Sequence, residues 1–120
     1  MPKEDFFAKH QSAGHRVAVS PIDGLPKLFM RKLSHGEYSL CLAKRETFEG
    51  KKGYALDYAI CCVVACVDEG GKPYFTKDDL GSLQLLGQDG ILPFAEAFNE
   101  ANGMNEGPKD PGPAESDAAA

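Results

Sequence analysis

The chain has 120 residues and a net charge of −5, with 26% charged and 42% hydrophobic residues. This length is enough for one domain with a modest core, and the composition is ordinary for a soluble globular protein. The negative charge argues against wrapping nucleic acid or docking on an anionic membrane, because both need a concentrated basic surface. A basic or apolar partner fits better.

No stretch of the sequence reaches the roughly 18 to 20 continuous apolar residues that a membrane span needs. The first seven residues contain two acidic side chains and no long apolar run, which is not the pattern of a secretory signal. We therefore expect a cytosolic protein whose cysteines are reduced.

The first ordered feature in chain order is an expected β-hairpin. Residues 1–15 are mixed and polar and are predicted to be a flexible N-terminal arm. Residues 16–22 read as a strand, Asp23 and Gly24 as a turn, and residues 25–33 as a second strand. An isolated hairpin is marginal in water, so helices should cover this one.

A capping box follows the hairpin. Ser34 and Glu37 have the spacing at which each side chain can bond the other residue's backbone N–H. A helix is predicted from there to about Phe48, ended by a glycine- and lysine-rich break at residues 50–53. Its inner stripe is expected to hold Tyr38, Cys41, Leu42 and Arg45.

Residues 54–67 are nearly all apolar and are the hardest part of the chain to assign. The composition of residues 60–67 suits a strand. The whole apolar run, residues 54–67, is 14 residues long, which is long for a strand, so the prediction is a central buried helix. An acidic pair and two glycines follow, and Gly70 or Gly71 would supply the left-handed residue that ends the helix.

Two further helices are predicted. Thr76 is a good N-cap, Asp79 can complete its capping box, and this helix should run to about Leu86, where Gly87 stops it. The last helix should begin near Asp89, and its apolar stripe is Ile91, Phe94, Ala95, Phe98 and Ala101.

The C-terminal end of the last helix is marked by Asn102 and Gly103. Pro93 is expected to lie in its first turn, where proline is tolerated. Residues 105–120 lack large apolar side chains and are predicted to be a disordered tail. The expected fold is therefore α+β and mainly helical, with the hairpin packed on about four helices in one domain, residues 16–104.

The chemistry-bearing residues give no catalytic motif. The four cysteines, Cys41, Cys61, Cys62 and Cys66, lie among small apolar residues and are read as buried hydrophobes. Cys62 and Cys66 are one helical turn apart and could share a metal ion, but the chain lacks the C-x-x-C pairs of zinc and redox sites. Nothing combines a nucleophile, a base and an orienting group, so we expect no enzyme and no cofactor.

The most distinctive motif is the segment 67–80. An apolar run ends in Asp-Glu-Gly-Gly, a turn follows, and a Phe75–Thr76 step leads into a helix start with Asp78 and Asp79. This motif resembles the tail assembly chaperones of long-tailed bacteriophages. The upstream hairpin and the closing Asn-Gly are similar as well, so that the resemblance covers residues 17–104. The chain departs from the family pattern in lacking an aromatic residue between the two strands.

The resemblance implies a non-enzymatic role in virion assembly. Family members act in the host cytoplasm, bind the tape measure protein, keep it soluble and help to recruit tail tube subunits. They are not retained in the mature virion. Many are made in two lengths by a programmed frameshift, and the codons of residues 107–109 could form the slippery run.

Tyr74, Phe75 and Phe94 are the candidate partner contacts, with core packing as the alternative for each. Self-association is left open. Two other readings compete with a chaperone. One is a minor tail protein that stays in the virion, and the other is a small thiol or metal protein that uses Cys62 and Cys66.

Overall fold

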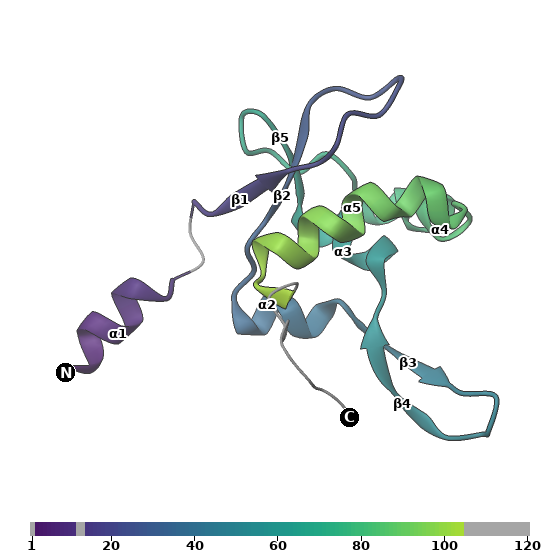
Figure 1. Cartoon of the computed structure of the whole chain (residues 1–120), viewed down its shortest axis with the longest axis horizontal. Helices are drawn as coiled ribbons and strands as arrows, with labels where there is room; N and C mark the ends of the chain where they lie inside the picture. The colour runs from purple at the N-terminus through teal and green to yellow at the C-terminus, as the bar shows by residue number, and fades with distance from the viewer. Residues whose placement is uncertain (1, 12–13, 105–120) are drawn as a thin grey trace, which may run out of the picture.

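The computed structural model describes residues 2–11 and 14–104, which form an α+β fold as predicted (Figure 1). The predicted tail and the codons proposed for frameshifting lie outside these residues. In chain order the elements are α1 (Lys3–Lys9), β1 (Arg16–Ala18), β2 (Leu28–Arg31), α2 (His35–Leu40), β3 (Leu42–Glu46), β4 (Lys52–Leu56), α3 (Tyr58–Ala65), β5 (Cys66–Asp68), the 3-10 turn η1 (Lys77–Asp79), α4 (Leu80–Gln84) and α5 (Gln88–Ala101). Within the predicted arm, α1 buries no residue.

The central sheet has the order β1-β2-β5 and is antiparallel throughout. β1 and β2 are the predicted hairpin, with Val17 opposite Met30, although both strands are shorter than expected. Helices α3 and α5 pack on this sheet and on each other. The largest fully buried side chains are Phe98, Leu28, Met30, Cys41, Cys61, Cys62 and Cys66.

The helix predicted from Ser34 to Phe48 is wrong beyond Leu40. The capping box is present, but the chain leaves α2 at Cys41 and forms the β3–β4 hairpin. Gly50 adopts a φ of 83° in the turn, a conformation that favours glycine. The residues of β3 have good helix propensity, and antiparallel pairing with β4 overrides it.

The helix predicted for residues 54–67 is also too long. Only Tyr58–Ala65 is helical, because residues before it belong to β4 and residues after it to β5. The Asp57 carboxylate accepts a hydrogen bond from the Ala59 N–H at 3.0 Å and so caps the start of α3. Sequence reasoning missed this N-cap, because Asp57 lies inside a run that is otherwise almost entirely apolar.

The glycine pair closes a turn after β5 instead of ending a helix. Asp68 accepts hydrogen bonds from the N–H groups of Gly70, at 2.9 Å, and Lys72, at 3.0 Å. Gly71 supplies the left-handed residue, with a φ of 85°. The chain then returns along β5, where the Tyr74 N–H bonds the Cys66 carbonyl at 3.0 Å.

The capping box of Thr76 and Asp79 is present and starts η1, from which α4 continues. α5 follows the predicted apolar stripe and ends at Ala101, with Asn102 as its C-cap and Gly103 next at a φ of 73°. Pro93 does not lie in the first turn, because α5 begins at Gln88. It leaves the carbonyl of Asp89 without its helical donor, and the exposure of Asp89 lets water replace that donor.

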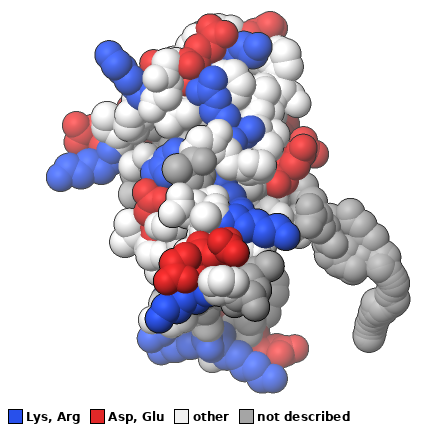
Figure 2. All heavy atoms as spheres, turned by 90° about the vertical axis from the view of Figure 1, so that its left-hand side faces the viewer, with Lys and Arg blue, Asp and Glu red and all other residues white. Residues whose placement is uncertain are grey.

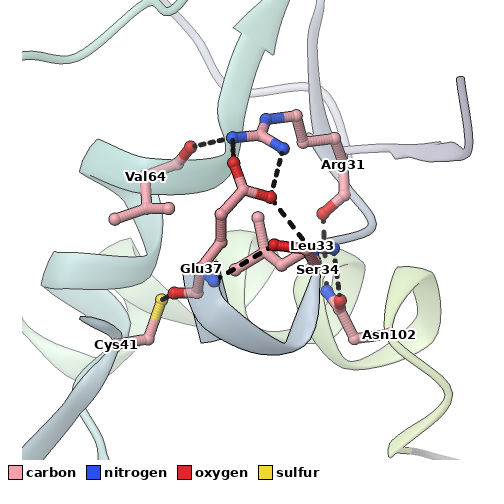
Figure 3. A network of polar contacts seen from close by, with 7 residues as sticks. All are labelled: Arg31, Leu33, Ser34, Glu37, Cys41, Val64 and Asn102. Carbon is pink, nitrogen blue, oxygen red and sulfur yellow. Dashed lines mark hydrogen bonds and ion pairs between the residues drawn. The ribbon is translucent and has the colours of Figure 1, made fainter. Parts of the chain in front are cut away.

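A polar network joins β2 to three helices (Figure 3). The Arg31 guanidinium donates to both oxygens of Glu37, at 3.1 and 2.8 Å, and to the Val64 carbonyl at 3.1 Å. Asn102 accepts from the Leu33 N–H at 2.8 Å and donates to the Arg31 and Phe98 carbonyls. The C-terminal end of α5 is thereby fixed to the end of β2.

We expect Glu37 to stabilise the fold in a pH-dependent way. The hydrogen bonds from Arg31 and from the Ser34 N–H lower the pKa of Glu37 from 4.5 to about 2. Its contribution is therefore complete above pH 4.5 and is lost as the pH falls toward 2. Solvent screening keeps it small, since the side chain is 35% exposed. Glu37→Gln keeps a residue that can complete the capping box. In urea unfolding, this variant should be less stable than the wild type at neutral pH and equally stable near pH 2. An equal difference in stability at both pH values would contradict the role of the Glu37 carboxylate.

Candidate functional site: an apolar groove beside α4 and α5

The β1–β2 loop, α4 and the first turns of α5 enclose an apolar groove with a volume of about 300 Å³. The groove is lined by Ile22, Leu25, Phe75, Asp79, Ser82, Leu83, Leu86, Gly90 and Phe94. Four separate segments contribute to it, so it exists only in the folded chain. We refer to this set of residues as the apolar groove.

Two of the three predicted contact residues meet in this groove. The rings of Phe75 and Phe94 are 5.8 Å apart, edge to face. Phe94 is 2% exposed and belongs to the core as well as to the floor of the groove. Tyr74 packs on the other side of Phe75, with ring centroids 5.0 Å apart, and does not line the groove. The core-packing alternative therefore describes Phe94, while Phe75 is half-buried.

Local signals position the walls. The Thr76 hydroxyl accepts from the Asp78 N–H at 3.3 Å, and the Asp79 carboxylate accepts from the Thr76 N–H at 2.8 Å. This box starts the helical segment that leads to Leu83 and Leu86, both of which line the groove. On the opposite wall, the N–H of Leu25 bonds the carbonyl of Ile22 at 3.1 Å and holds the hairpin loop closed.

Apolar side chains of the groove remain accessible to solvent. Leu86, which lines the groove, is 43% exposed. A second hollow of about 380 Å³ lies within the β1–β2 loop and shares Ile22 and Leu25 with the groove. An exposed leucine in an apolar hollow is typical of a surface that binds another chain.

One charged side chain lines the groove, the carboxylate of Asp79. The part of the chain that supplies most of the lining is also acidic, since residues 73–104 contain five acidic side chains and one basic one. An apolar groove in an acidic part of the chain favours an apolar segment that carries basic side chains at its edges.

A second candidate site, which is polar, is a hollow of about 370 Å³ between the β3–β4 hairpin and α4. Its carboxylate, Asp57, is 6% exposed and accepts from Ala59, from Arg45 at 3.1 Å and from Gln84 at 3.4 Å. These bonds tie the hairpin to the body of the fold. Asp57 therefore has a structural role, as the N-cap of α3 and as the acceptor that joins the hairpin to α4.

The four cysteines are buried free thiols, as predicted. Burial raises the pKa of Cys62, and it raises that of Cys66 to about 12. Neutral buried thiols such as those of Cys62 and Cys66 are poor nucleophiles and poor metal ligands. Among the described residues no group of three or more His, Cys, Asp or Glu side chains could hold a metal ion.

We therefore expect all four thiols to resist modification in the folded protein. A thiol reagent at neutral pH should label none of them at an appreciable rate until a denaturant is added, after which all four should react. Rapid labelling of Cys62 or Cys66 in the native state would contradict the burial of these side chains.

Sequence reasoning missed Ile22, Leu25 and Leu86 as groove residues. One signal was present, since Leu85 and Leu86 are adjacent at the end of a short helix and cannot both face the core.

In the part of the chain that the structure describes, no helix has the length and apolar character needed to cross a membrane. Comparisons with protein-family models, with curated proteins and with solved structures found no match.

Proposed function

We propose that this protein is a non-enzymatic tail assembly chaperone of a long-tailed bacteriophage, and that it binds helical segments of the tape measure protein. The observation that carries the proposal is the apolar groove, with the exposed Leu86 in its lining and Asp79 as its one charged residue. An amphipathic helix can place its apolar face in such a groove, while basic side chains at its edges meet the acidic part of the chain that forms it.

The motif that resembles the chaperone family also builds the groove. The turn after β5 leads the chain to Phe75, and the Thr76 box then starts the segment that supplies Leu83 and Leu86. This supports a role for the motif in partner binding, because Phe75 and Asp79 of the motif line the groove. The proposal rests on this coincidence together with the resemblance.

Further steps of the proposed role are recruitment of tail tube subunits, action in the host cytoplasm and absence from the mature virion. A minor tail protein that stays in the particle is the alternative. Mass spectrometry of purified virions separates the two, since a chaperone should be missing and a minor tail protein present. The thiol or metal alternative gains no support from four buried thiols.

Co-expression with the tape measure gene of the same genome tests the proposal. We expect the tape measure protein to become soluble and to co-purify with this chain, because its apolar helices would be covered. A tape measure protein that stays insoluble, with no complex recovered, would overturn the proposal. Expression of each protein alone is the control.

A further inference from the structure

The β3–β4 hairpin stands away from the rest of the fold (Figure 1). Its two strands pair only with each other among the described residues, and neither packs extensively on another element. A lone two-stranded hairpin is marginally stable in water, and its unpaired edges can pair with another strand. Each strand of the hairpin therefore has one edge on which its backbone groups have no partner strand among the described residues.

The hydrogen-bond register shows which backbone groups are free on each edge. The Asp57 N–H bonds the Cys41 carbonyl at 2.9 Å, and the Thr47 N–H bonds the Lys51 carbonyl at 2.8 Å. Bonded pairs alternate along an antiparallel ladder, so the 44–54 pair between them is not hydrogen-bonded. The N–H and C=O groups of Tyr54 on β4 and of Lys44 on β3 therefore point outward.

The two edges differ in how well each could meet a second copy of itself. In an antiparallel pairing about a two-fold axis at Tyr54, each Tyr54 faces the other, and Lys52 faces Leu56. The same operation on β3 places Lys44 opposite Lys44, and like charges directly opposite each other are destabilising. Tyr54 is also 71% exposed, so its ring is available for the contact.

We propose that two copies of this chain associate through their β4 edges, with Tyr54 opposite Tyr54. The product is a four-stranded antiparallel sheet, β3-β4-β4-β3, which passes the number of strands needed for a stable sheet. No residue of the hairpin lines the apolar groove, so both grooves stay open. The association is independent of the proposed function.

Charge weakens this arrangement, because a two-fold association brings two like-charged hairpins together. Basic side chains gather at the lower end of the molecule, where the hairpin lies (Figure 2). Within the hairpin, Glu46 is paired with Lys52, so the lysine that adjoins the interface has an acidic neighbour. The interface is small, and we expect a weak dimer that depends on concentration.

Analytical ultracentrifugation of the full chain over a wide concentration range tests the dimer. Tyr54→Pro removes the outward N–H of β4 and spares the bonds within the hairpin, and Lys44→Pro does the same on β3 as the matched control. We expect Tyr54→Pro to raise the dimer Kd about tenfold or more and Lys44→Pro to leave it nearly unchanged. Circular dichroism verifies that both variants fold.

A second pair of variants keeps the test independent of proline. Tyr54→Glu and Tyr54→Lys each place like charges across the two-fold axis, so each alone should be monomeric, while their equimolar mixture should form a heterodimer. A wild-type chain that stays monomeric at all concentrations would overturn the proposal. So would equal effects of the two proline variants, or a mixture that associates no better than its components.

Discussion

On the proposed function, replacing Leu86 with glutamate should strongly reduce solubilisation of the tape measure protein while the fold is retained. Leu86 lines the apolar groove and is 43% exposed, so the new carboxylate can remain hydrated in the free protein. In a complex it would be buried beside Asp79 against an apolar helix. We expect a loss of at least about 2 kcal/mol of binding free energy, or roughly a thirtyfold rise in Kd.

Leu40→Glu is the matched control for this variant. Leu40 is 64% exposed on α2 and does not line the apolar groove, so the same chemical change should leave binding within about twofold. Soluble yield of the tape measure protein and its Kd for each variant are the measurements. Equal loss in the two variants, or no loss in Leu86→Glu, would show that the groove is not the contact surface.

Phe98→Ala should cost the fold about 3–5 kcal/mol. Phe98 is fully buried between the sheet and the helices. Its ring stacks on Tyr38 at 6.5 Å and meets Tyr58 edge to face at 6.2 Å. Because a domain of this size is stable by only about 5–15 kcal/mol, the variant should lose a large fraction of its stability and unfold at a much lower urea concentration than the wild type.

Urea unfolding followed by circular dichroism measures this cost. Phe48→Ala is the control, since Phe48 lies fully exposed at the tip of the β3–β4 hairpin and should change stability by less than about 0.5 kcal/mol. If the two variants had the same unfolding midpoint, the position of Phe98 in the core would be wrong.

The parts of the fold that could be predicted carry strong local signals. The turn at Asp23 and Gly24 lies between two apolar runs, and the capping boxes at Ser34 and Thr76 each mark the start of a helix. α5 combines a clear apolar stripe with a terminal glycine. In each case a few neighbouring residues decide the conformation, so the sequence is sufficient.

The segment from residue 41 to residue 68 could not be predicted because distant partners decide it. β3 consists of leucine, alanine, lysine, arginine and glutamate, all good helix formers, and it becomes a strand by pairing with β4. Cys66 and Val67 leave the helix because β2 has an open edge, where Cys66 pairs with Met30 and Val67 pairs with Phe29. Neither pairing has a local signature.

The candidate site was predictable only in part for the same reason. Phe75 and Phe94 were recognisable as large aromatics near a distinctive motif, and the structure brings their rings together. Ile22 and Leu25 come from a loop about 50 residues earlier in the chain, and only the folded sheet and helices place them opposite α4.

The proposal that the apolar groove binds tape measure helices is tested most directly by locating the surface that such a helix contacts. Backbone NMR spectra of the labelled full chain should be recorded as a synthetic amphipathic helix from the tape measure protein is added. We predict that the largest shift changes fall on Ile22, Leu25, Phe75 and Leu86, around the apolar groove. The absence of any change, or changes confined to other surfaces such as α1 or the β3–β4 hairpin, would contradict the account.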